Sequence, residues 1–345
     1  MSEPCVAGWD VGGAHLKVAV ADSTGRLTMV RQVPCRLWLG LDCLREALAA
    51  AGDEALAAGT HAVTMTGELT DLFESRADGV IRLIEALIQA LPPARLRVYA
   101  GGDGFLSPDE ATARPRAVAS ANWHAGASWA AGRHGDGIFM DIGSTTTDIV
   151  PVGGGRVTAR GYTDDERLAE EELVYTGLTR TPVFAVARTA SFGGRRRRLM
   201  AELFATMADV YRLTGELVED DDQQPAADGG AKTVDGSMRR LARTLGLDAA
   251  DGSVADWRRY AGDLAEAQLG LIRESFSRIA SRPDIADVAP IIGAGAGRFL
   301  AARLAARVGR PYVDFATLVD GADETRAAAA RCAPAVAVAL MAVGP

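Results

Sequence analysis

The chain has 345 residues, of which 48% are hydrophobic and 24% charged, as is typical of a globular protein long enough for two domains. Its formal net charge of -8 argues against general binding to nucleic acids or membrane surfaces, because both favour a basic face. No apolar stretch reaches the roughly 18 residues of a membrane-spanning helix, and the N-terminus lacks the features of a signal peptide.

The cysteines show neither metal-binding spacing nor the density of a disulfide-stabilised chain. They predict reduced thiols and, without a targeting segment, a cytoplasmic protein. The four positions are Cys5, Cys35, Cys43 and Cys332.

The first predicted element is a β-hairpin, in which apolar runs at 6–9 and 18–21 flank the segment 10–17, DVGGAHLK. Glycines allow backbone N–H groups to approach a phosphate closely. An aspartate at the strand end suits Mg²⁺, which takes one or two carboxylates together with substrate phosphates. The candidates are Asp10 for the metal, Gly12 and Gly13 for phosphate, and His15 and Lys17 as catalytic groups that neutralise charge.

The pattern next predicts a helix at 41–58, a strand at 61–66, an amphipathic helix at 79–91, a strand at 97–100 and a small-residue helix at 122–133. Glu68 and Asp103 each follow one of these strands, and ligand crevices open at strand ends in α/β sheets. Either is a candidate base that accepts a proton from a hydroxyl nucleophile. The alternative is ordinary turn chemistry at both positions.

A second hairpin repeats the first, because the segment 141–148, DIGSTTTD, lies between apolar runs at 138–140 and 149–152. Two such turns predict that a phosphate chain is held from both sides. The candidates are Asp141 and Asp148 for the metal, and Gly143, Ser144, Thr145 and Thr146 for phosphate, with a strand cap as the alternative for Asp148.

The rest of the chain predicts helices at 199–217 and 255–280, a strand at 288–292 and a final helix at 324–343 interrupted at Pro334. The four arginines at 195–198 are predicted to be a solvated helix start, with attraction of an anionic substrate as the alternative. Gly293, Gly295 and Gly297 are candidates for nucleotide or ligand contact, and Glu172, Tyr175, Arg180, Thr206, Asp209 and Lys232 for substrate contact. For the last three, a solvated helix face or a helix cap is the alternative.

Together, the two hairpins, the glycine-rich strand end and the two small-residue helices resemble the superfamily of actin, sugar kinases and the Hsp70 ATPase. The resemblance implies an α/β fold of two actin-like ATPase (ribonuclease H-like) lobes with a cleft between them. It implies a first lobe at 1–130 and a second lobe at 131–323, with a helical insertion at about 195–280 and a ligand segment at 290–300. The C-terminal helix at about 324–345 is expected to pack back on the first lobe.

Within the superfamily, the segment 141–148 is similar to the hydantoinase/oxoprolinase branch. A closer resemblance, over nearly the whole chain, is to the group of tetrahydromethanopterin-linked C1-transfer proteins. It is carried by GWDVGGA at 8–14, MTGEL at 65–69, YAGGDG at 99–104, ELVYTG at 172–177, TMADVY at 206–211 and KTVDGS at 232–237.

That group includes a synthase of methanofuran biosynthesis, and methylofuran is the corresponding product in bacterial relatives. The resemblance implies an Mg²⁺-dependent synthase that joins an aminomethyl-furanmethanol diphosphate to a phenol and releases pyrophosphate. The phenol substrate is expected to be a glutamylated tyramine or tyrosine compound.

One position departs from the superfamily pattern, because Ala14 stands where kinase hairpins carry Thr or Ser. A hydroxyl contact to a γ-phosphate is therefore missing, which fits a diphosphate at least as well as ATP. Two other functions stay open: an ATP-dependent kinase or oxoprolinase-type hydrolase, and a non-enzymatic nucleotide-dependent sensor. ATP remains a second candidate ligand, and a homo-oligomer remains open.

Overall fold

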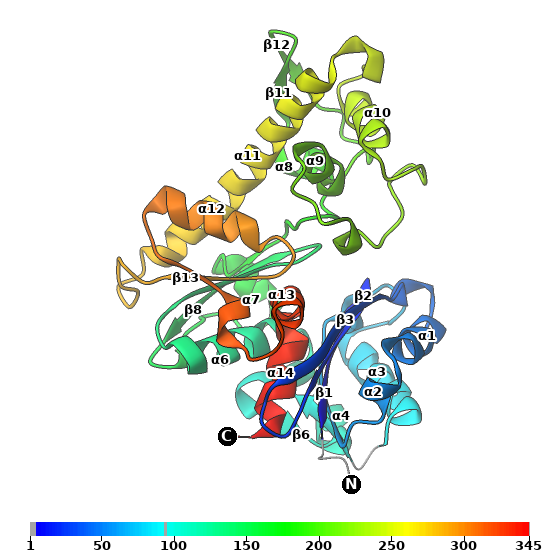
Figure 1. The fold of residues 1–345 in the computed structure, drawn as a ribbon, viewed down its shortest axis with the longest axis vertical. Coiled ribbons are helices and arrows are strands. Elements are labelled where there is room, and N and C mark those ends of the chain that lie inside the picture. Colours follow the sequence, from blue (N-terminus) through cyan, green and yellow to red (C-terminus); the bar gives the residue numbers. More distant parts are fainter. Residues whose placement is uncertain (1–4, 93–94, 345) are drawn as a thin grey trace.

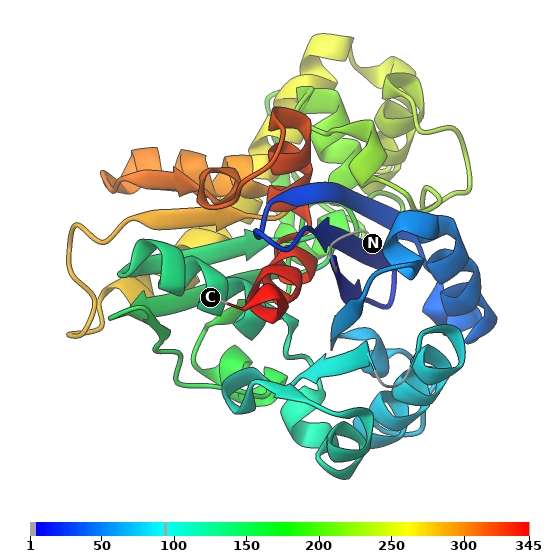
Figure 2. The ribbon, with the colours of Figure 1, turned by 60° about the horizontal axis from the view of Figure 1, so that its bottom comes forward.

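The computed structural model describes residues 5–92 and 95–344. Within these residues the strands form two six-stranded sheets and one two-stranded hairpin. Each large sheet belongs to one lobe, and helix α14 (Ala333–Val343) lies between the two lobes in both Figure 1 and Figure 2.

The first lobe contains a mixed sheet with the strand order β3-β2-β1-β4-β5-β6. Its strands are β1 (Val6–Val11), β2 (His15–Ala21), β3 (Leu27–Pro34), β4 (Thr60–Met65), β5 (Leu96–Tyr99) and β6 (Phe105–Leu106). Its helices are α1 (Asp42–Ala51), α2 (Asp53–Leu56), α3 (Arg76–Ala90), α4 (Pro108–Ala113) and α5 (Pro115–Val118). β1 pairs with β2 as an antiparallel hairpin and with β4 in parallel.

Helix α14 covers one face of β1, which is buried along its whole length. A Cβ added at Gly8 would lie 2.1 Å from the carbonyl oxygen of Ala335, so only glycine permits this close approach. The opposite face of β1 presents Trp9 and Val11 to the apolar side chains of α1 and α3. Because both faces are covered, residues 6–9 of β1 are all apolar and do not alternate with polar residues.

The second lobe repeats this arrangement with the strand order β10-β8-β7-β13-β14, and β9 adds to β8. Its strands are β7 (Gly137–Ile142), β8 (Thr147–Gly153), β9 (Arg156–Val157), β10 (Leu173–Val174), β13 (Ile291–Ala294) and β14 (Tyr312–Asp314). Its helices are α6 (Asn122–His134), α7 (Asp164–Ala169) and α12 (Arg298–Val308), while α13 (Asp323–Arg331) contacts β3 of the first lobe as well as β13. β7 pairs with β8 as an antiparallel hairpin and with β13 in parallel.

Each lobe therefore begins its sheet with an antiparallel hairpin, and the first strand of that hairpin pairs on its other side with a parallel strand. This confirms the predicted α/β class and the two-lobed actin-like ATPase fold. An apolar cluster containing Ala19 of β2, Phe139 of β7 and Val336 of α14 connects the lobes. The hairpins are thereby held on either side of a common centre.

A mostly helical insertion lies between β10 and β13, and its long helix α11 rises away from the second sheet in Figure 1. Its elements are α8 (Val183–Val186), β11 (Thr189–Phe192), β12 (Arg195–Arg198), α9 (Met207–Thr214), α10 (Val234–Thr244) and α11 (Val254–Ala280).

The predicted helix at 199–217 is wrong in its first half. Helix α9 begins only after Thr206, because the Thr206 side chain and that of Asp209 form a capping box. The four arginines at 195–198 are also not a helix start, since they form the exposed strand β12 paired with β11. The apolar residues before Thr206 have the spacing of a helix, but the capping box places the N-terminus of α9 at Thr206.

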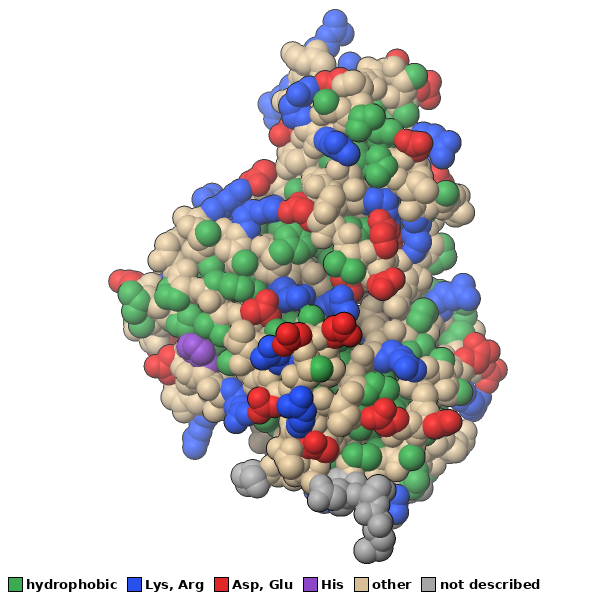
Figure 3. Space-filling model, in the orientation of Figure 1, with side chains coloured by type: hydrophobic (Ala, Val, Ile, Leu, Met, Phe, Trp, Pro, Cys, Tyr) green, Lys and Arg blue, Asp and Glu red, His purple; other side chains and the backbone are tan. Residues whose placement is uncertain are grey.

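Among the described residues no single helix is long and apolar enough to cross a membrane. Helices α13 and α14 pass that test only together, although they are bent by 111° and α14 is buried within the protein. On the face drawn in Figure 3, Lys and Arg side chains are interspersed with Asp and Glu. The structure also has surface ion pairs, for example between Arg307 and Glu266.

Candidate active site

A cavity of about 460 Å³ opens between the two lobes, and both glycine-rich turns line it. The first hairpin contributes Asp10, Gly12, Gly13, Ala14, His15 and Lys17, and the second contributes Asp141, Gly143, Ser144, Thr145, Thr146 and Asp148. The structure therefore brings the predicted metal and phosphate residues of both lobes to one shared opening.

The two hairpins have the same register but different charges. Asp10 lies opposite Lys17 across β1 and β2, whereas the equivalent Asp141 lies opposite Asp148 across β7 and β8. The Lys17 ammonium is 3.4 Å from Asp10 Oδ2. One lobe thus supplies a carboxylate with a cation, and the other supplies two carboxylates.

Burial raises the pKa of Asp10, although the nearby side chains of Lys17 and Asn122 oppose the shift. It raises the pKa of Asp141 to about 7, with Lys17 again opposing. Burial alone would lower the pKa of Lys17, but Asp10 and Asp141 hold it above its ordinary value. The ammonium is therefore the cation that balances these two carboxyl groups.

Asp148 has its own partner, Arg167, whose Nη2 donates to Asp148 Oδ1 at 2.9 Å. Burial raises the pKa of Asp148, and Arg167 opposes the shift. The Arg167 guanidinium also lies over the ring of Trp123, 4.0 Å from its centroid. Arg167 and Trp123 both line the cavity, and the sequence analysis identified neither.

Burial and the nearby cations Lys17 and Arg180 lower the pKa of His15 to about 3. These surroundings favour the neutral imidazole over the cationic form that the sequence predicts. The ring lines the cavity, and its Nε2 has no hydrogen-bond partner among the described residues. A neutral imidazole there can donate or accept one hydrogen bond.

The turn of the second hairpin is fixed from behind by the segment 177–180. The carbonyl of Ser144 accepts hydrogen bonds from the backbone N–H groups of Thr179 and Arg180, at 3.1 and 2.9 Å. A Cβ added at Gly177 would lie 2.6 Å from backbone atoms of this turn, so glycine permits the contact. The turn is therefore held rigidly with its side chains at the cavity.

Arg180 connects the two lobes at the mouth of the cavity. Its Nη1 donates to Thr145 Oγ1 at 3.2 Å, and its guanidinium lies over the ring of Trp38 in the first lobe. Tyr175 also lines the cavity and is 65% exposed. The sequence did not predict Trp38 as a site residue, because it lies in the short helical turn Leu37–Leu39 and no motif surrounds it.

The two candidate bases have different positions. Glu68 is 1% exposed and lies behind Ser120, whose Oγ donates to Glu68 Oε1 at 2.9 Å. Ser120 lines the cavity, whereas Glu68 does not. Asp103 lies outside the cavity, where its half-exposed carboxylate pairs with Arg114 at 3.3 Å.

Glu172, a predicted substrate contact, is fully buried away from the cavity. Its carboxylate accepts hydrogen bonds from the backbone N–H groups of Arg160 and Gly161 and forms an ion pair with Arg282. It therefore connects the segment after β9 to the end of α11. Of the three candidates in this segment, Tyr175 and Arg180 lie at the cavity.

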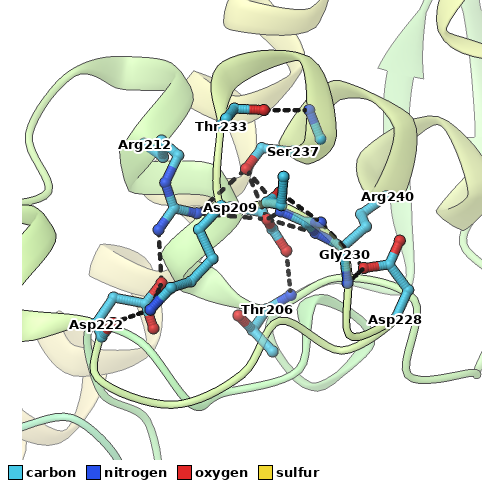
Figure 4. A network of polar contacts seen from close by, with 12 residues as sticks. Thr206, Asp209, Arg212, Asp222, Asp228, Gly230, Thr233, Ser237 and Arg240 are labelled. Carbon is cyan, nitrogen blue, oxygen red and sulfur yellow. Dashed lines mark hydrogen bonds and ion pairs between the residues drawn. The ribbon is translucent and has the colours of Figure 1, made fainter.

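Thr206, Asp209 and Lys232 lie within the insertion and not at the cavity. Figure 4 shows Asp209 at the centre of a polar network. Its carboxylate accepts from Ser237 Oγ at 2.7 Å and from Arg240 Nε at 2.8 Å, and it is buried. Asp209 therefore does not lie on a solvated helix face, which was the alternative to substrate contact. The network instead stabilises the insertion.

Gly293, Gly295 and Gly297 do not line the cavity either. A Cβ at Gly293 would meet the ring of Tyr312, and one at Gly295 would lie 2.4 Å from Asp141 Oδ1. Gly295 has a φ of +83°, which favours glycine. These glycines allow the start of α12 to pack directly behind Asp141.

Among the described residues no three His, Cys, Asp or Glu side chains form a complete metal cage. The residues present nevertheless fit Mg²⁺, because this ion takes only one or two carboxylates when phosphates supply further oxygens. Asp10 Oδ1 is buried and has no hydrogen-bond partner within the described chain, as expected of an atom reserved for such a ligand.

Comparisons with known proteins agree with this architecture. Residues 59–339 match the family model described as hydantoinase/oxoprolinase. A synthase from Methanocaldococcus jannaschii, named (4-{4-[2-(gamma-L-glutamylamino)ethyl]phenoxymethyl}furan-2-yl)methanamine synthase, is 32% identical over 82% of this chain and 84% of its own. A protein of the same name from Methanococcus vannielii is 29% identical over 42% of this chain and 65% of its own.

Among solved structures, a nucleotide-free acetone carboxylase superposes with a TM-score of 0.53 at 13% identity. The match covers 88% of this chain and 67% of that chain, and it bears on the fold alone. Both sequence relatives are named as synthases, which supports an enzyme. The family match spans most of the chain, and the protein belongs to the hydantoinase/oxoprolinase family.

Proposed function

We propose that this enzyme is an Mg²⁺-dependent synthase of methanofuran or methylofuran biosynthesis. It condenses an aminomethyl-furanmethanol diphosphate with the phenol of a tyramine- or tyrosine-derived compound and releases pyrophosphate. The observation that carries the proposal is the pair of glycine-rich turns from opposite lobes, which meet at one cavity with buried carboxylates and Lys17. The 32% identical relative has a name that contains the corresponding phenoxymethyl-furan ether.

The diphosphate would lie between the two turns. Backbone N–H groups of Gly12, Gly13 and Gly143 and the hydroxyls of Ser144 and Thr145 are the proposed donors. Asp10 and Asp141 would hold Mg²⁺, with Asp148 near them. Mg²⁺ would there neutralise charge on the leaving pyrophosphate.

The reaction demands little of the protein beyond this charge stabilisation. An electron-rich furan stabilises a developing cation on its adjacent methylene, so the carbon–oxygen bond to the diphosphate breaks once the leaving group is stabilised. Lys17 and Arg180 supply positive charge at the cavity, and the neutral His15 supplies a hydrogen bond. The phenol oxygen then forms the new ether bond.

The aromatic acceptor would lie against the apolar part of the cavity wall. Trp38, Leu69 and Tyr175 are partly exposed and line the cavity, so an aromatic ring can pack against them without rearrangement of the core.

Incubation of the purified enzyme with the furan diphosphate, Mg²⁺ and candidate phenols tests the proposal. We expect pyrophosphate release that requires the phenol, together with an ether product of the matching mass. Asp10→Asn should lower the rate at least about 10²-fold, whereas Asp42→Asn, an exposed control on α1, should not. Phenol-independent turnover, or hydrolysis of ATP in place of ether formation, would contradict it.

The ATP-dependent alternatives make a different binding prediction. A kinase or hydrolase should be stabilised against heat more by ATP than by pyrophosphate at equal concentration. The proposed synthase should be stabilised more by pyrophosphate, because both glycine-rich turns line the cavity whereas Gly293, Gly295 and Gly297 pack outside it. A larger shift in melting temperature with ATP would favour the alternatives.

A further inference from the structure

Ser120 has an unusual combination of properties for a residue in a short linker. It lies between α5 and α6, it is 4% exposed, and its backbone has a φ of +52°. Serine rarely adopts this left-handed conformation, which is strained for any residue with a Cβ, and such strain concentrates at functional sites. The residue nevertheless lines the cavity.

The Ser120 hydroxyl is coupled to a buried acid. Its Oγ donates to Glu68 Oε1 at 2.9 Å, and the second carboxyl oxygen, Oε2, has no hydrogen-bond partner among the described residues. Glu68 is in the short helical turn Gly67–Leu69 that follows β4. A Cβ at Gly79 of α3 would lie 2.8 Å from Glu68, so a glycine allows this turn to sit deep against α3.

The pair lies beside the phosphate site and not at a remote wall. Asn122, two residues after Ser120, lines the cavity together with Asp10 and lies near enough to that carboxyl group to lower its pKa. Thr66 and Leu69, on either side of Glu68, also line the cavity. The hydroxyl is therefore at the same end of the cavity as the carboxylate proposed to hold the metal.

We infer that Ser120 and Glu68 form a proton relay that accepts the phenol proton during ether formation. The inference rests on the proposed function and assigns the base that this function requires. The phenol O–H donates its proton to Ser120 Oγ while the Ser120 proton passes to Glu68 Oε1. The phenol oxygen forms a bond to the furan methylene, and the electron pair of the broken carbon–oxygen bond leaves with pyrophosphate.

Ser120 is then a catalytic residue that touches the substrate, and Glu68 is a positioning residue and proton acceptor that acts through it. Burial raises the pKa of Glu68, while the Ser120 hydrogen bond opposes the shift. Of the charged groups around it, Asp164 also raises this pKa and Arg76 lowers it, and these two form an ion pair at 2.7 Å. A carboxylate with a raised pKa is a more effective base near neutral pH.

The strained backbone offers a discriminating variant. Ser120→Gly removes the hydroxyl and also relieves the positive φ, which offsets part of the cost of leaving Glu68 without its donor. Ser120→Ala removes the hydroxyl and keeps the strain. If the residue were merely structural, Ser120→Gly would retain full activity.

We expect both Ser120 variants to lose about 10²-fold in kcat, with KM for the furan diphosphate within about twofold of the wild type. Glu68→Gln should lose a similar factor, and the acidic limb of its kcat–pH profile should disappear. Asp103→Asn, the matched change of the other strand-end carboxylate, should behave as wild type. Wild-type kcat in Ser120→Gly, or an unchanged pH profile in Glu68→Gln, would overturn the relay.

A second measurement varies the substrate. Ring-fluorinated tyramines have more acidic phenols and need less help from a base, so the deficit of Ser120→Gly should shrink as the phenol becomes more acidic. A constant deficit across the series would contradict proton transfer. A wild-type enzyme that forms no ether would overturn the proposed function and the relay with it, whereas ether formation with a fully active Ser120→Gly would overturn the relay alone.

Discussion

The ring of Trp38, from the first lobe, lies beneath the guanidinium of Arg180, from the second lobe, with the guanidinium carbon 5.6 Å from the ring centroid. Because Arg180 also donates to Thr145 Oγ1, it connects the glycine-rich turn of the second lobe to an aromatic ring of the first. Arg180 therefore links the two lobes directly at the cavity wall.

This contact predicts a role in acceptor binding. Trp38→Ala should raise KM for the phenol substrate about tenfold, which corresponds to about 1.4 kcal/mol, while Trp38→Phe should retain most of the affinity. Steady-state kinetics with each substrate varied in turn measures the effect. A tenfold rise in KM for the diphosphate, with KM for the phenol unchanged, would argue against an acceptor site at Trp38.

Lys17 should stabilise the fold as well as the charge of the site. Lys17→Met leaves Asp10 buried without its cation, and we expect a loss of about 3 kcal/mol in the free energy of unfolding at pH 7. The double variant Asp10→Asn/Lys17→Met should recover part of that loss. Urea unfolding of the four proteins of this cycle gives the coupling energy, and additive effects would contradict the pairing.

Two histidines that are largely shielded from solvent, His61 and His124, predict that stability falls in acid. Burial lowers the pKa of His61 and of His124 to about 4, and His61 Nδ1 accepts a hydrogen bond from Trp9 Nε1 at 3.3 Å. Because the folded chain disfavours the protonated rings, the unfolded chain binds more protons between pH 6.5 and pH 4. This part of the stability is present above pH 6.5 and is lost as the pH falls towards 4.

His61→Gln keeps an acceptor for Trp9 but cannot titrate. Its unfolding free energy should therefore depend less on pH in this window than that of the wild type, by about 2 kcal/mol between pH 6.5 and pH 4. Denaturant titrations at several pH values measure this difference. Parallel curves for the two proteins would contradict the assignment to His61.

The network in the insertion predicts a stability effect without a binding effect. Asp209→Ala leaves the nearly fully buried Arg240 without its carboxylate, and we expect a loss of about 3 to 5 kcal/mol in unfolding free energy. KM for both substrates should be unchanged in the folded fraction, because Asp209 lies away from the cavity. Glu202→Ala, an exposed change nearby, should stay within about 0.5 kcal/mol of the wild type. A specific rise in KM for Asp209→Ala would restore the substrate role.

The sequence determined the two glycine-bearing hairpins and, through them, the fold. Each hairpin is local, since apolar runs flank a glycine-bearing turn and the period of two fixes which side chains share a face. Asp10 and Asp141 could be paired because both occupy the same place in the same pattern. The helix at 199–217 failed because apolar spacing alone cannot locate a helix start that a capping box decides.

Tertiary structure decided which polar residues face the cavity and in what protonation state. Ser120, Trp38 and Arg167 lie in segments without a motif and reach the site only when distant elements pack together. Glu172 and Asp209 lie in segments that resemble family motifs, but the carboxylate of each forms a buried ion pair and does not reach the cavity. Burial and the position of neighbouring charges set these outcomes, and both depend on contacts between residues far apart in the chain, which local sequence patterns do not encode.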